Sequence, residues 1–498
     1  MLRNLNKDMS DEKKISIKFA HGFGDCSLFA CAIPSWISRG WTVEVEASSD
    51  KACLFKAAGA TIVAKAKEHH PYLHPGDTPH DQDDSWAGNK LGWNLGTGPM
   101  PVVGTKPELW EETVGRKLRV EAPSDPAELD KLIEPLGKFI AVHTRGNTGQ
   151  GDKNFRADDE LKLYQALLKE TDCTLLLLDW DHRVSKARHS RIRHMGDHFK
   201  KLSIPDLAYV LDRAALLIGV DSGPLHFSRF TNVPTLGVWF NFQPARFALP
   251  RAETLHVAPS NHGGWTHRRR HSWNIVDGDT RDGVTVAKFA ARLVAGEKPT
   301  DIVIEQLFDK ANTTSGNQFR DRDRTFRAAF SEIKNIPAPV VVETGCIRAQ
   351  EDWSAGYVSY LCGLWLKNHG GGNLTSVDIT PQHVQFAKSK VTSFPVEVVC
   401  QGSVEWLEAY TGPPIDLLYL DSLDTDQPGY ADHCLAEAKA AEPHLADNAV
   451  ILIDDTFSTG TAEGYFGKGE KAVPYLVGRG WKIICEGYQV VLKRDNAA

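Results

Sequence analysis

Residues 221–226 carry the clearest chemical signal in this sequence. They read Asp-Ser-Gly-Pro-Leu-His and join two apolar runs, residues 214–220 and 233–239. A short buried strand that ends in a small polar turn and opens a helix leaves backbone N–H groups directed at one point, where a phosphate binds. The pattern therefore predicts a cradle for the diphosphate of a nucleotide.

A single carboxylate follows the first expected strand. Residues 22–25 read Gly-Phe-Gly-Asp and connect a strand at residues 15–19 to a helix at residues 26–39. A glycine turn at a strand-to-helix junction can direct Asp25 into a cleft, but Asp is also a common helix cap. From the motif alone, both interpretations of Asp25 stay open.

A second loop gathers groups that bind anions. His143, Thr144 and Arg145 come at the end of an expected strand at residues 139–143, and small polar residues lead from there to Lys153. Hydroxyls, amides and a cation at the carboxyl end of a strand suit an anionic ligand. Each residue alone is more typical of a solvated loop, so the interpretation depends on the combination.

Taken in order, these three motifs and the Asn-Val-Pro-Thr run at residues 232–235 resemble the heptosyltransferase-like glycosyltransferases of family 9, which have the GT-B fold. The resemblance covers residues 15–260. It implies two Rossmann-like domains that face each other, with the sugar nucleotide mainly on the second. It also implies transfer with inversion at the anomeric carbon and without a metal.

The same resemblance assigns roles to individual residues. Asp25 would be the general base that takes the proton of the acceptor hydroxyl. His226 would be either a supporting group or simply packed, and we expect it to be packed. The groups that would hold the departing diphosphate are Lys153, Thr144 and the backbone of Ser222 and Gly223. The identity of the sugar and of its nucleotide stays open.

A second nucleotide-type pattern begins at Val340. An apolar strand ends in Glu343 and Gly345, and a second strand at residues 373–378 ends in Asp378. Such a pair fits a nucleoside, because the glycine permits close approach and the acid accepts hydrogen bonds from the ribose hydroxyls.

Polar residues also follow the later strands of this region. Ser403 follows a strand at residues 396–400, Asp421 ends a buried strand, and Asp454 and Asp455 end another. The order and spacing resemble class I S-adenosylmethionine-dependent methyltransferases, particularly O-methyltransferases of the catechol or macrocin type. The resemblance spans residues 338–494, with residues 481–485 and 489–492 as the final antiparallel strands.

This second resemblance implies a complete cofactor site. Glu343 and Gly345 would approach the methionine part of the cofactor, Asp378 the ribose and Ser403 the adenine, with Asp421 also beside the cofactor. Three acids stand where metal-dependent members bind Mg²⁺ through oxygen ligands: Asp421, Asp454 and Asp455. The alternative is that these strand-end acids are only helix caps or turn residues.

The alternation of strands and helices predicts an α/β protein with parallel sheets. The fold class would be a GT-B pair of Rossmann-like domains followed by a third Rossmann-like domain of the methyltransferase type. The expected boundaries are an acceptor domain at 1–125, a sugar-nucleotide domain at 126–262, a basic and helical linker at 263–337 and a methyltransferase domain at 338–498. Residues 69–106 lack periodicity and predict a long loop.

Composition restricts the partners. The chain has 498 residues, a formal net charge of −7, and nine cysteines without the spacing of a zinc site. These features predict reduced thiols, no general attraction to nucleic acid, and a soluble cytoplasmic protein without a membrane span. Basic clusters at residues 182–201 and 265–271 are more typical of solvated or salt-bridged faces than of a nucleic-acid site.

The leading hypothesis is a bifunctional enzyme. It would be an inverting glycosyltransferase that uses a nucleotide-diphosphate sugar, joined to an O-methyltransferase that uses S-adenosylmethionine, and both would act on a glycan. One alternative is glycosyl or methyl modification of nucleic acid. The other is a carbohydrate- or nucleotide-binding scaffold in which one half is inactive. The oligomeric state stays open.

Overall fold

The computed structural model shows two compact units. The first comprises Met1–Thr266 with Trp273–Pro299, and the second comprises His267–Ser272 with Thr300–Ala498. The residues that the structure describes are 14–19, 22–38, 40, 42–66, 117–146, 153–179, 187–199, 201–241, 244, 248, 251–259, 274–314, 317–349, 358–369, 371–392, 394–459 and 464–494. The expected loop at 69–106, the basic cluster at 265–271 and part of the cluster at 182–201 lie outside them.

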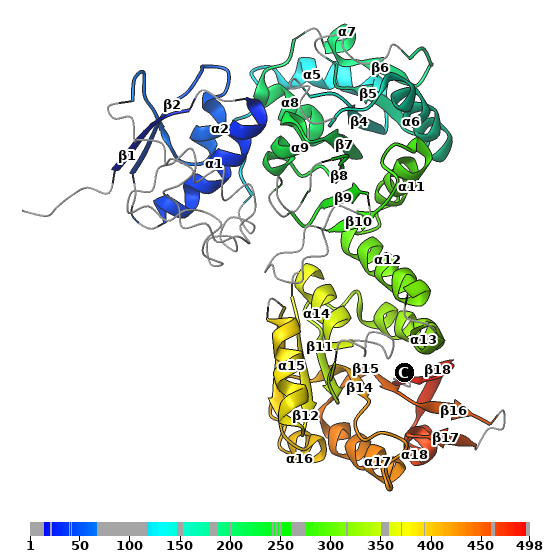
Figure 1. Cartoon of the computed structure of the whole chain (residues 1–498). Helices are drawn as coiled ribbons and strands as arrows, with labels where there is room; N and C mark the ends of the chain where they lie inside the picture. The colour runs from blue at the N-terminus through cyan, green and yellow to red at the C-terminus, as the bar shows by residue number, and fades with distance from the viewer. Residues whose placement is uncertain are drawn as a thin grey trace, which may run out of the picture. The chain divides into compact units, whose positions relative to one another are not determined.

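The first unit begins with a small parallel sheet in the order β1-β2-β3 (Figure 1). Its elements are β1 (Lys14–Lys18), α1 (Phe23–Ile37), β2 (Thr42–Glu46), α2 (Ala52–Ala57) and β3 (Thr61–Ile62). Phe19, Phe29 and Phe55 are buried together, and the Phe19 and Phe29 rings stack with their centroids 4.2 Å apart. This aromatic cluster holds α1 and α2 to the strands.

A larger sheet in the same unit has seven parallel strands in the order β10-β9-β8-β7-β4-β5-β6. The strands are β4 (Phe139–His143), β5 (Thr174–Leu177), β6 (Ile192–His194), β7 (Leu216–Val220), β8 (Thr235–Val238), β9 (Thr254–Ala258) and β10 (Ile275–Asp277). The helices are α5 (Pro126–Ile133), α6 (Ala157–Glu170), α7 (Met195–Phe199), α8 (Ile204–Leu211), α9 (Gly223–Phe227) and α11 (Gly283–Val294). The near-continuous apolar strands are those of a sheet covered on both faces.

The second unit is built on a seven-stranded sheet in the order β13-β12-β11-β14-β15-β19-β18. The strands are β11 (Val340–Thr344), β12 (Asn373–Asp378), β13 (Val396–Cys400), β14 (Ile415–Leu420), β15 (Leu445–Ile453), β18 (Trp481–Glu486) and β19 (Val490–Arg494). β19 pairs antiparallel with both β15 and β18, as expected for residues 481–485 and 489–492. A separate hairpin joins β16 (Thr456–Ser458) to β17 (Tyr465–Gly467).

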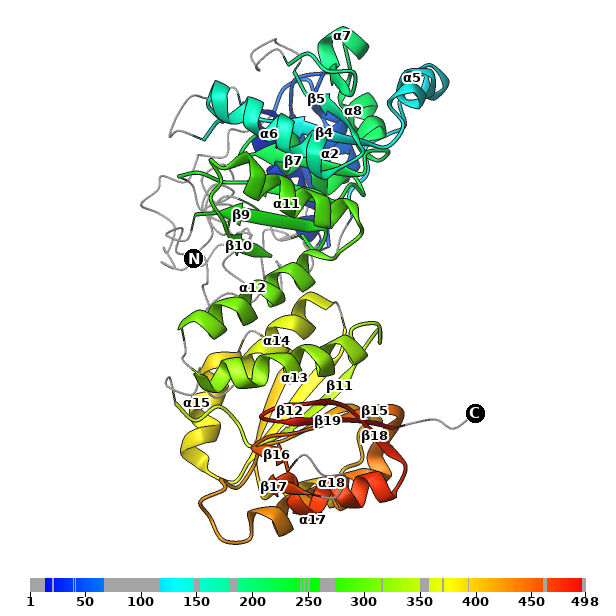
Figure 2. The same cartoon turned by 90° about the vertical axis from the view of Figure 1, so that its right-hand side faces the viewer.

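The helices of the second unit extend beyond the expected methyltransferase boundary. They are α12 (Pro299–Thr314), α13 (Asn317–Ile333), α14 (Val358–His369), α15 (Pro381–Val391), α16 (Ser403–Glu408), α17 (Tyr430–Ala441) and α18 (Gly469–Gly478). Figure 2 shows α13 lying across the sheet. Phe326 of α13 packs on Tyr419 of β14, and Glu332 pairs with Lys493 at 2.6 Å. The expected linker at 263–337 therefore includes a helix that packs into the second unit.

The α/β fold class is confirmed by these sheets, and their strand order fixes where ligands can bind. In the first unit the order reverses between β4 and β7, and in the second between β11 and β14. Ligands of open parallel sheets bind in the crevice at such a switch point, outside the carboxyl ends of the strands. The predicted site residues follow these same strands.

The packing of α11 against α6 depends on Gly283. A Cβ on Gly283 would lie 2.5 Å from the backbone nitrogen of Leu163 in α6, so the helices touch backbone to backbone. Asp282 caps α11 by accepting hydrogen bonds from the backbone N–H groups of Val284 and Thr285. The cap and the glycine together fix this helix on the sheet.

We expect Gly283→Ala to destabilise the first unit by about 1–3 kcal/mol, because the added methyl group must push the two helix backbones apart. Hydrogen exchange measured by mass spectrometry on peptides from α6 and α11 should show faster opening. Gly478→Ala is the matched helical control, since an added Cβ there meets nothing within 4 Å. Unchanged protection in α6 would contradict the role assigned to Gly283.

Candidate functional site

The turn after β7 brings the predicted diphosphate residues together. Asp221 Oδ1 lies 3.0 Å from Nε2 of His226, and Asp221 Oδ2 lies 3.8 Å from Nζ of Lys153. Ser222 Oγ lies 2.8 Å from Nδ1 of His143. His226 is buried, as expected, and its ring bonds Asp221 rather than standing open to a ligand. Among the described residues, Lys153 places a cation at this turn, and its side chain is 17% exposed.

His143 is an uncharged part of this cluster. Burial lowers the pKa of its imidazole to about 4, so the ring is neutral at neutral pH. A neutral ring beside Ser222 holds the turn by hydrogen bonding and adds no charge to the site. In the part of the chain that the structure describes, Lys153 is therefore a source of positive charge at this turn.

Two glycines bring α1 against the turn. A Cβ on Gly24 would lie 3.0 Å from Cδ2 of His226, and a Cβ on Gly223 would lie 2.5 Å from Cδ1 of Phe23. The Phe23 and Phe227 rings also pack, with centroids 4.9 Å apart. Asp25 lies in the first turn of α1, directly after Gly24. The predicted base and the predicted diphosphate turn therefore belong to the same junction.

Thr144 is a buried residue with a protein partner. Its side chain is fully buried, and its hydroxyl donates a 2.7 Å hydrogen bond to Oε1 of Glu160. Arg145 pairs with both oxygens of the same carboxylate, at 2.7 and 3.1 Å. The Thr144 hydroxyl supports the loop from inside, and its predicted contact with a diphosphate stays a prediction.

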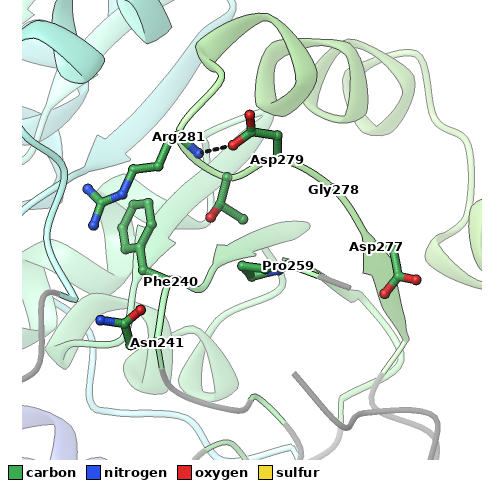
Figure 3. Close-up of a pocket in the computed structure, with 8 residues that line it drawn as sticks. Phe240, Asn241, Pro259, Asp277, Gly278, Asp279 and Arg281 are labelled. Carbon is green, nitrogen blue, oxygen red and sulfur yellow. Dashed lines mark hydrogen bonds between the residues drawn. The ribbon is translucent and has the colours of Figure 1, made fainter. Parts of the chain in front are cut away.

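A cavity of ≈ 530 Å³ opens at the carboxyl ends of β8, β9 and β10 (Figure 3). The Arg281 guanidinium lies over the Phe240 ring, 3.9 Å from its centroid, and donates a 3.0 Å hydrogen bond to the carbonyl of Asn154. Asn154 is the neighbour of Lys153 in the chain. The lining residues are Phe240, Asn241, Pro259, Asp277, Gly278, Asp279, Thr280 and Arg281. Arg281 was missed because no sequence motif marks it.

The second unit has a cavity of ≈ 430 Å³ at its switch point. Every predicted cofactor residue of this unit lines it: Glu343, Gly345, Asp378, Ser403 and Asp421. Gly345 has a φ of +81°, and an added Cβ would lie 2.7 Å from the carbonyl oxygen of Asp421. Only glycine fits where β11 and β14 approach so closely.

Glu343 is a buried acid in the wall of this cavity. Its carboxylate accepts hydrogen bonds from the hydroxyls of Ser359 and Ser376, the latter at 2.6 Å. Burial raises the pKa of Glu343 to about 7, although the two serine hydrogen bonds act in the opposite direction. Its charge therefore changes near neutral pH.

Asp378 and Ser403 are held at neighbouring strand ends. Asp378 accepts hydrogen bonds from the backbone N–H groups of Thr380 at 2.7 Å and Cys346 at 3.3 Å. Ser403 Oγ lies 3.2 Å from Nε2 of His433, which also lines the cavity. The loop after β11 is thereby tied to the end of β12.

The three predicted metal ligands do converge. One oxygen from each of Asp421, Asp454 and Asp455 lies within 4.8 Å of the others. Two cations that the sequence analysis did not predict form ion pairs with these acids. Lys468 Nζ lies 2.6 Å from Asp421 Oδ1 and 3.2 Å from Asp455 Oδ2. Arg322, from the expected linker, pairs with Asp454 at 2.9 Å.

The charged groups of this cluster are paired, and three of them, Arg322, Asp454 and Lys468, are buried. Burial raises the pKa of Asp454, but the charge and hydrogen bonds of Arg322 together with the charge of Lys468 and a hydrogen bond with Asp421 outweigh burial and hold the pKa at about 2. Arg322 and Lys468 are 5% and 2% exposed. Because protein cations already occupy the space between the acids, the residues present do not fit a divalent ion.

Comparisons with known proteins agree with both resemblances. Residues 153–272 match the model of glycosyltransferase family 9 (heptosyltransferase), and residues 353–456 match the model of a methyltransferase domain. The chain is 29% identical over 174 residues to an inferred glycosyltransferase of Haemophilus influenzae. That match covers 32% of this chain and 46% of the relative, so it spans less than half of the relative's length.

Solved structures of both kinds are similar to parts of the chain. ADP-heptose lps heptosyltransferase II of E. coli is 9% identical and covers 57% of this chain and 99% of its own, with a TM-score of 0.40. A family 9 glycosyltransferase of Veillonella parvula is 12% identical and covers 58% of this chain and 98% of its own, with a TM-score of 0.38. The N-methyltransferase NodS of Bradyrhizobium japonicum is 12% identical and covers 36% of this chain and 99% of its own, with a TM-score of 0.26. Within the described residues, no helix is long and apolar enough to cross a membrane.

We expect the stability of the second unit to fall as the pH rises from 4.5 to about 7, because the unfolded chain ionises Glu343 in that window and the folded chain does not. Glu343→Gln should remove this part of the pH dependence. Pulse proteolysis in urea between pH 5 and 8, with fragments assigned to the second unit, measures it. The exposed Glu397→Gln is the control, and identical pH profiles for all three proteins would disprove the expectation.

Proposed function

We propose that this chain, in which a glycosyltransferase family 9 region and a methyltransferase domain are present, carries out two transfers on a glycan. The first unit would transfer a sugar from a nucleoside-diphosphate donor with inversion. The second would methylate a hydroxyl with S-adenosylmethionine. The observation that best supports this is that each unit gathers its predicted residues at the switch point of a parallel sheet.

In the glycosyl transfer, Asp25 is the proposed base. It would take the proton of the acceptor hydroxyl as that oxygen attacks the anomeric carbon from the face opposite the diphosphate. The bond from the anomeric carbon to the diphosphate breaks, and its electron pair leaves with the phosphate oxygen. Lys153 and the backbone N–H groups of Ser222 and Gly223 would stabilise the negative charge that develops there.

The cavity beside Arg281 could hold a part of the substrates other than the diphosphate. Its aromatic floor and guanidinium, together with Asp277 and Asp279, combine an apolar face with polar groups that can bond hydroxyls. Because Arg281 bonds the carbonyl next to Lys153, a ligand that moves Arg281 would also affect the diphosphate residues. We assign this cavity to a sugar portion of the substrates.

In the methyl transfer, the cavity of the second unit would hold the cofactor. Asp378 would accept hydrogen bonds from the ribose hydroxyls, Gly345 would allow close approach of the methionine part, and Ser403 would contact the adenine. The acceptor oxygen would attack the methyl carbon in line with the sulfur, and the electron pair of the breaking carbon–sulfur bond would go to sulfur. The proton of the acceptor hydroxyl would pass to the Asp421 carboxyl group. Asp421 would border the acceptor, because it lines the cavity at the end of β14.

The glycosyltransferase proposal predicts release of a nucleoside diphosphate when the full chain meets its sugar nucleotide. In a panel of ADP-, GDP- and UDP-sugars with glycan acceptors, Asp25→Asn should lower the rate by about 10²- to 10⁴-fold, since the base is lost. Lys153→Ala should slow release and weaken diphosphate binding by about tenfold, because it removes the cation. Lys162→Ala, an exposed lysine on α6, should act like wild type.

Three outcomes of that experiment distinguish the glycosyltransferase hypothesis from its two alternatives. Full activity in Asp25→Asn would refute the assignment of the base. Binding of a sugar nucleotide without turnover would favour the scaffold alternative. Turnover with an oligonucleotide acceptor, and none with glycans, would favour modification of nucleic acid.

The methyltransferase proposal predicts binding of S-adenosylmethionine to the second unit. In calorimetric titrations of the full chain, Asp378→Asn should weaken binding by about 10- to 100-fold, because a carboxylate that accepts ribose hydrogen bonds contributes about 1.5–3 kcal/mol. Asp447→Asn, at an exposed position of the same unit, is the control. Equal affinity in all three proteins would place the cofactor elsewhere or exclude it.

A further inference from the structure

The acid cluster at the ends of β14 and β15 has no carboxylate oxygen left without a protein donor. Each oxygen of its three acids lies 2.6 to 3.2 Å from a nitrogen or hydroxyl of another side chain. The acids are Asp421, Asp454 and Asp455, and the donors are Arg322, Tyr419, Lys468 and Gln489. An oxygen site for Mg²⁺ or Mn²⁺ needs free carboxylate oxygens at about 2.0–2.2 Å from the metal.

Lys468 occupies the position between Asp421 and Asp455. Its ammonium group has three hydrogens and three acceptors: Asp421 Oδ1 at 2.6 Å, the Asp421 carbonyl at 3.2 Å and Asp455 Oδ2 at 3.2 Å. All of its hydrogen-bonding capacity is used. A divalent ion at the same point would meet the fixed positive charge of the Lys468 ammonium group.

The backbone around Lys468 is built to hold it there. The β16–β17 hairpin leaves Asp455 and returns to Lys468, whose backbone N–H donates a 3.0 Å hydrogen bond to the carbonyl of Asp455. Gly467 has a φ of +83°, and a Cβ at this position would overlap the same carbonyl. The return of the hairpin therefore places Lys468 directly over the acids.

Arg322 neutralises the deeper part of the cluster. Its guanidinium bonds both oxygens of Asp454 at 2.9 Å and also Asp455 at 3.2 Å, and Gln489 adds a 2.8 Å bond to Asp454. The cluster thus combines three acids with two cations. Removing either cation would leave a buried acid uncompensated, which is far more costly than the pair itself is stabilising.

The geometry points to Lys468 as the resident cation of this cluster, in the place where metal-dependent methyltransferases would bind a divalent ion. The second unit therefore takes no Mg²⁺ or Mn²⁺ at these acids. Asp421 is the acid of the cluster that lines the cavity, and it is a group positioned by Lys468 on one oxygen and by Tyr419 on the other. This inference rests on the contacts of the cluster and not on the proposed methyl transfer.

Titration of the full chain with Mn²⁺, followed by electron paramagnetic resonance, tests it without any substrate. The wild-type protein should bind no Mn²⁺ that depends on Asp455, so wild type and Asp455→Asn should give the same titration. Lys468→Met keeps the length of the side chain and removes its charge. It should gain about one Mn²⁺ per chain, because it frees oxygens on two acids, and this site should disappear in Lys468→Met/Asp455→Asn. Lys388→Met, at an exposed position, is the control.

Each result bears on the inference directly. A Mn²⁺ ion bound by the wild-type protein and lost in Asp455→Asn would overturn it. So would a folded Lys468→Met protein with no additional Mn²⁺ site, because Lys468 would then not be what excludes the metal. If Lys468→Met fails to fold, the comparison of wild type with Asp455→Asn still decides. If the wild-type protein does not bind S-adenosylmethionine, that result counts against the proposed methyltransferase function and not against the inference about Lys468.

Discussion

Both candidate sites depend on one constraint, which is the reversal of strand order in a parallel sheet. Between β4 and β7, and again between β11 and β14, the connecting segments leave in opposite directions and open a crevice at the carboxyl ends. At each crevice a glycine lets another part of the chain approach its backbone closely. Gly223 meets Phe23 in the first unit, and Gly345 meets the carbonyl of Asp421 in the second. Close backbone approach brings polar groups from distant parts of the chain within reach of one ligand.

The second site adds a cluster of buried charge, and burial determines how it is arranged. Taking carboxylates out of water is expensive unless cations and hydrogen bonds replace the solvent. α13 supplies Arg322 for Asp454, and the start of α18 supplies Lys468 for Asp421. The sheet therefore needs α13 for electrostatic as well as for apolar reasons. A helix that resembles a linker in sequence becomes part of the second unit.

The sequence predicted the strand ends well, because an apolar run followed by Gly, Ser or Asp marks them locally. Asp378, Ser403 and Asp421 were placed in this way, and all line one cavity. The sequence could not predict contacts made across long separations. Lys468 lies 47 residues from Asp421, and Arg322 lies 132 residues from Asp454. The hydrogen bond of Thr144 was missed for a related reason, since its partner Glu160 lies on α6, 16 residues further along the chain.

If the second unit transfers a methyl group as proposed, a lysine in place of a metal changes what its site must do. A divalent ion binds the acceptor oxygen directly and makes its hydroxyl more acidic, whereas the hydrogen bonds of Lys468 are all used by Asp421 and Asp455. Lys468 can therefore act on the acceptor only through Asp421, by fixing its orientation. Rate enhancement would then depend on alignment of the acceptor oxygen with the methyl group and on proton transfer to a carboxylate. This favours acceptors that the rest of the cavity holds rigidly.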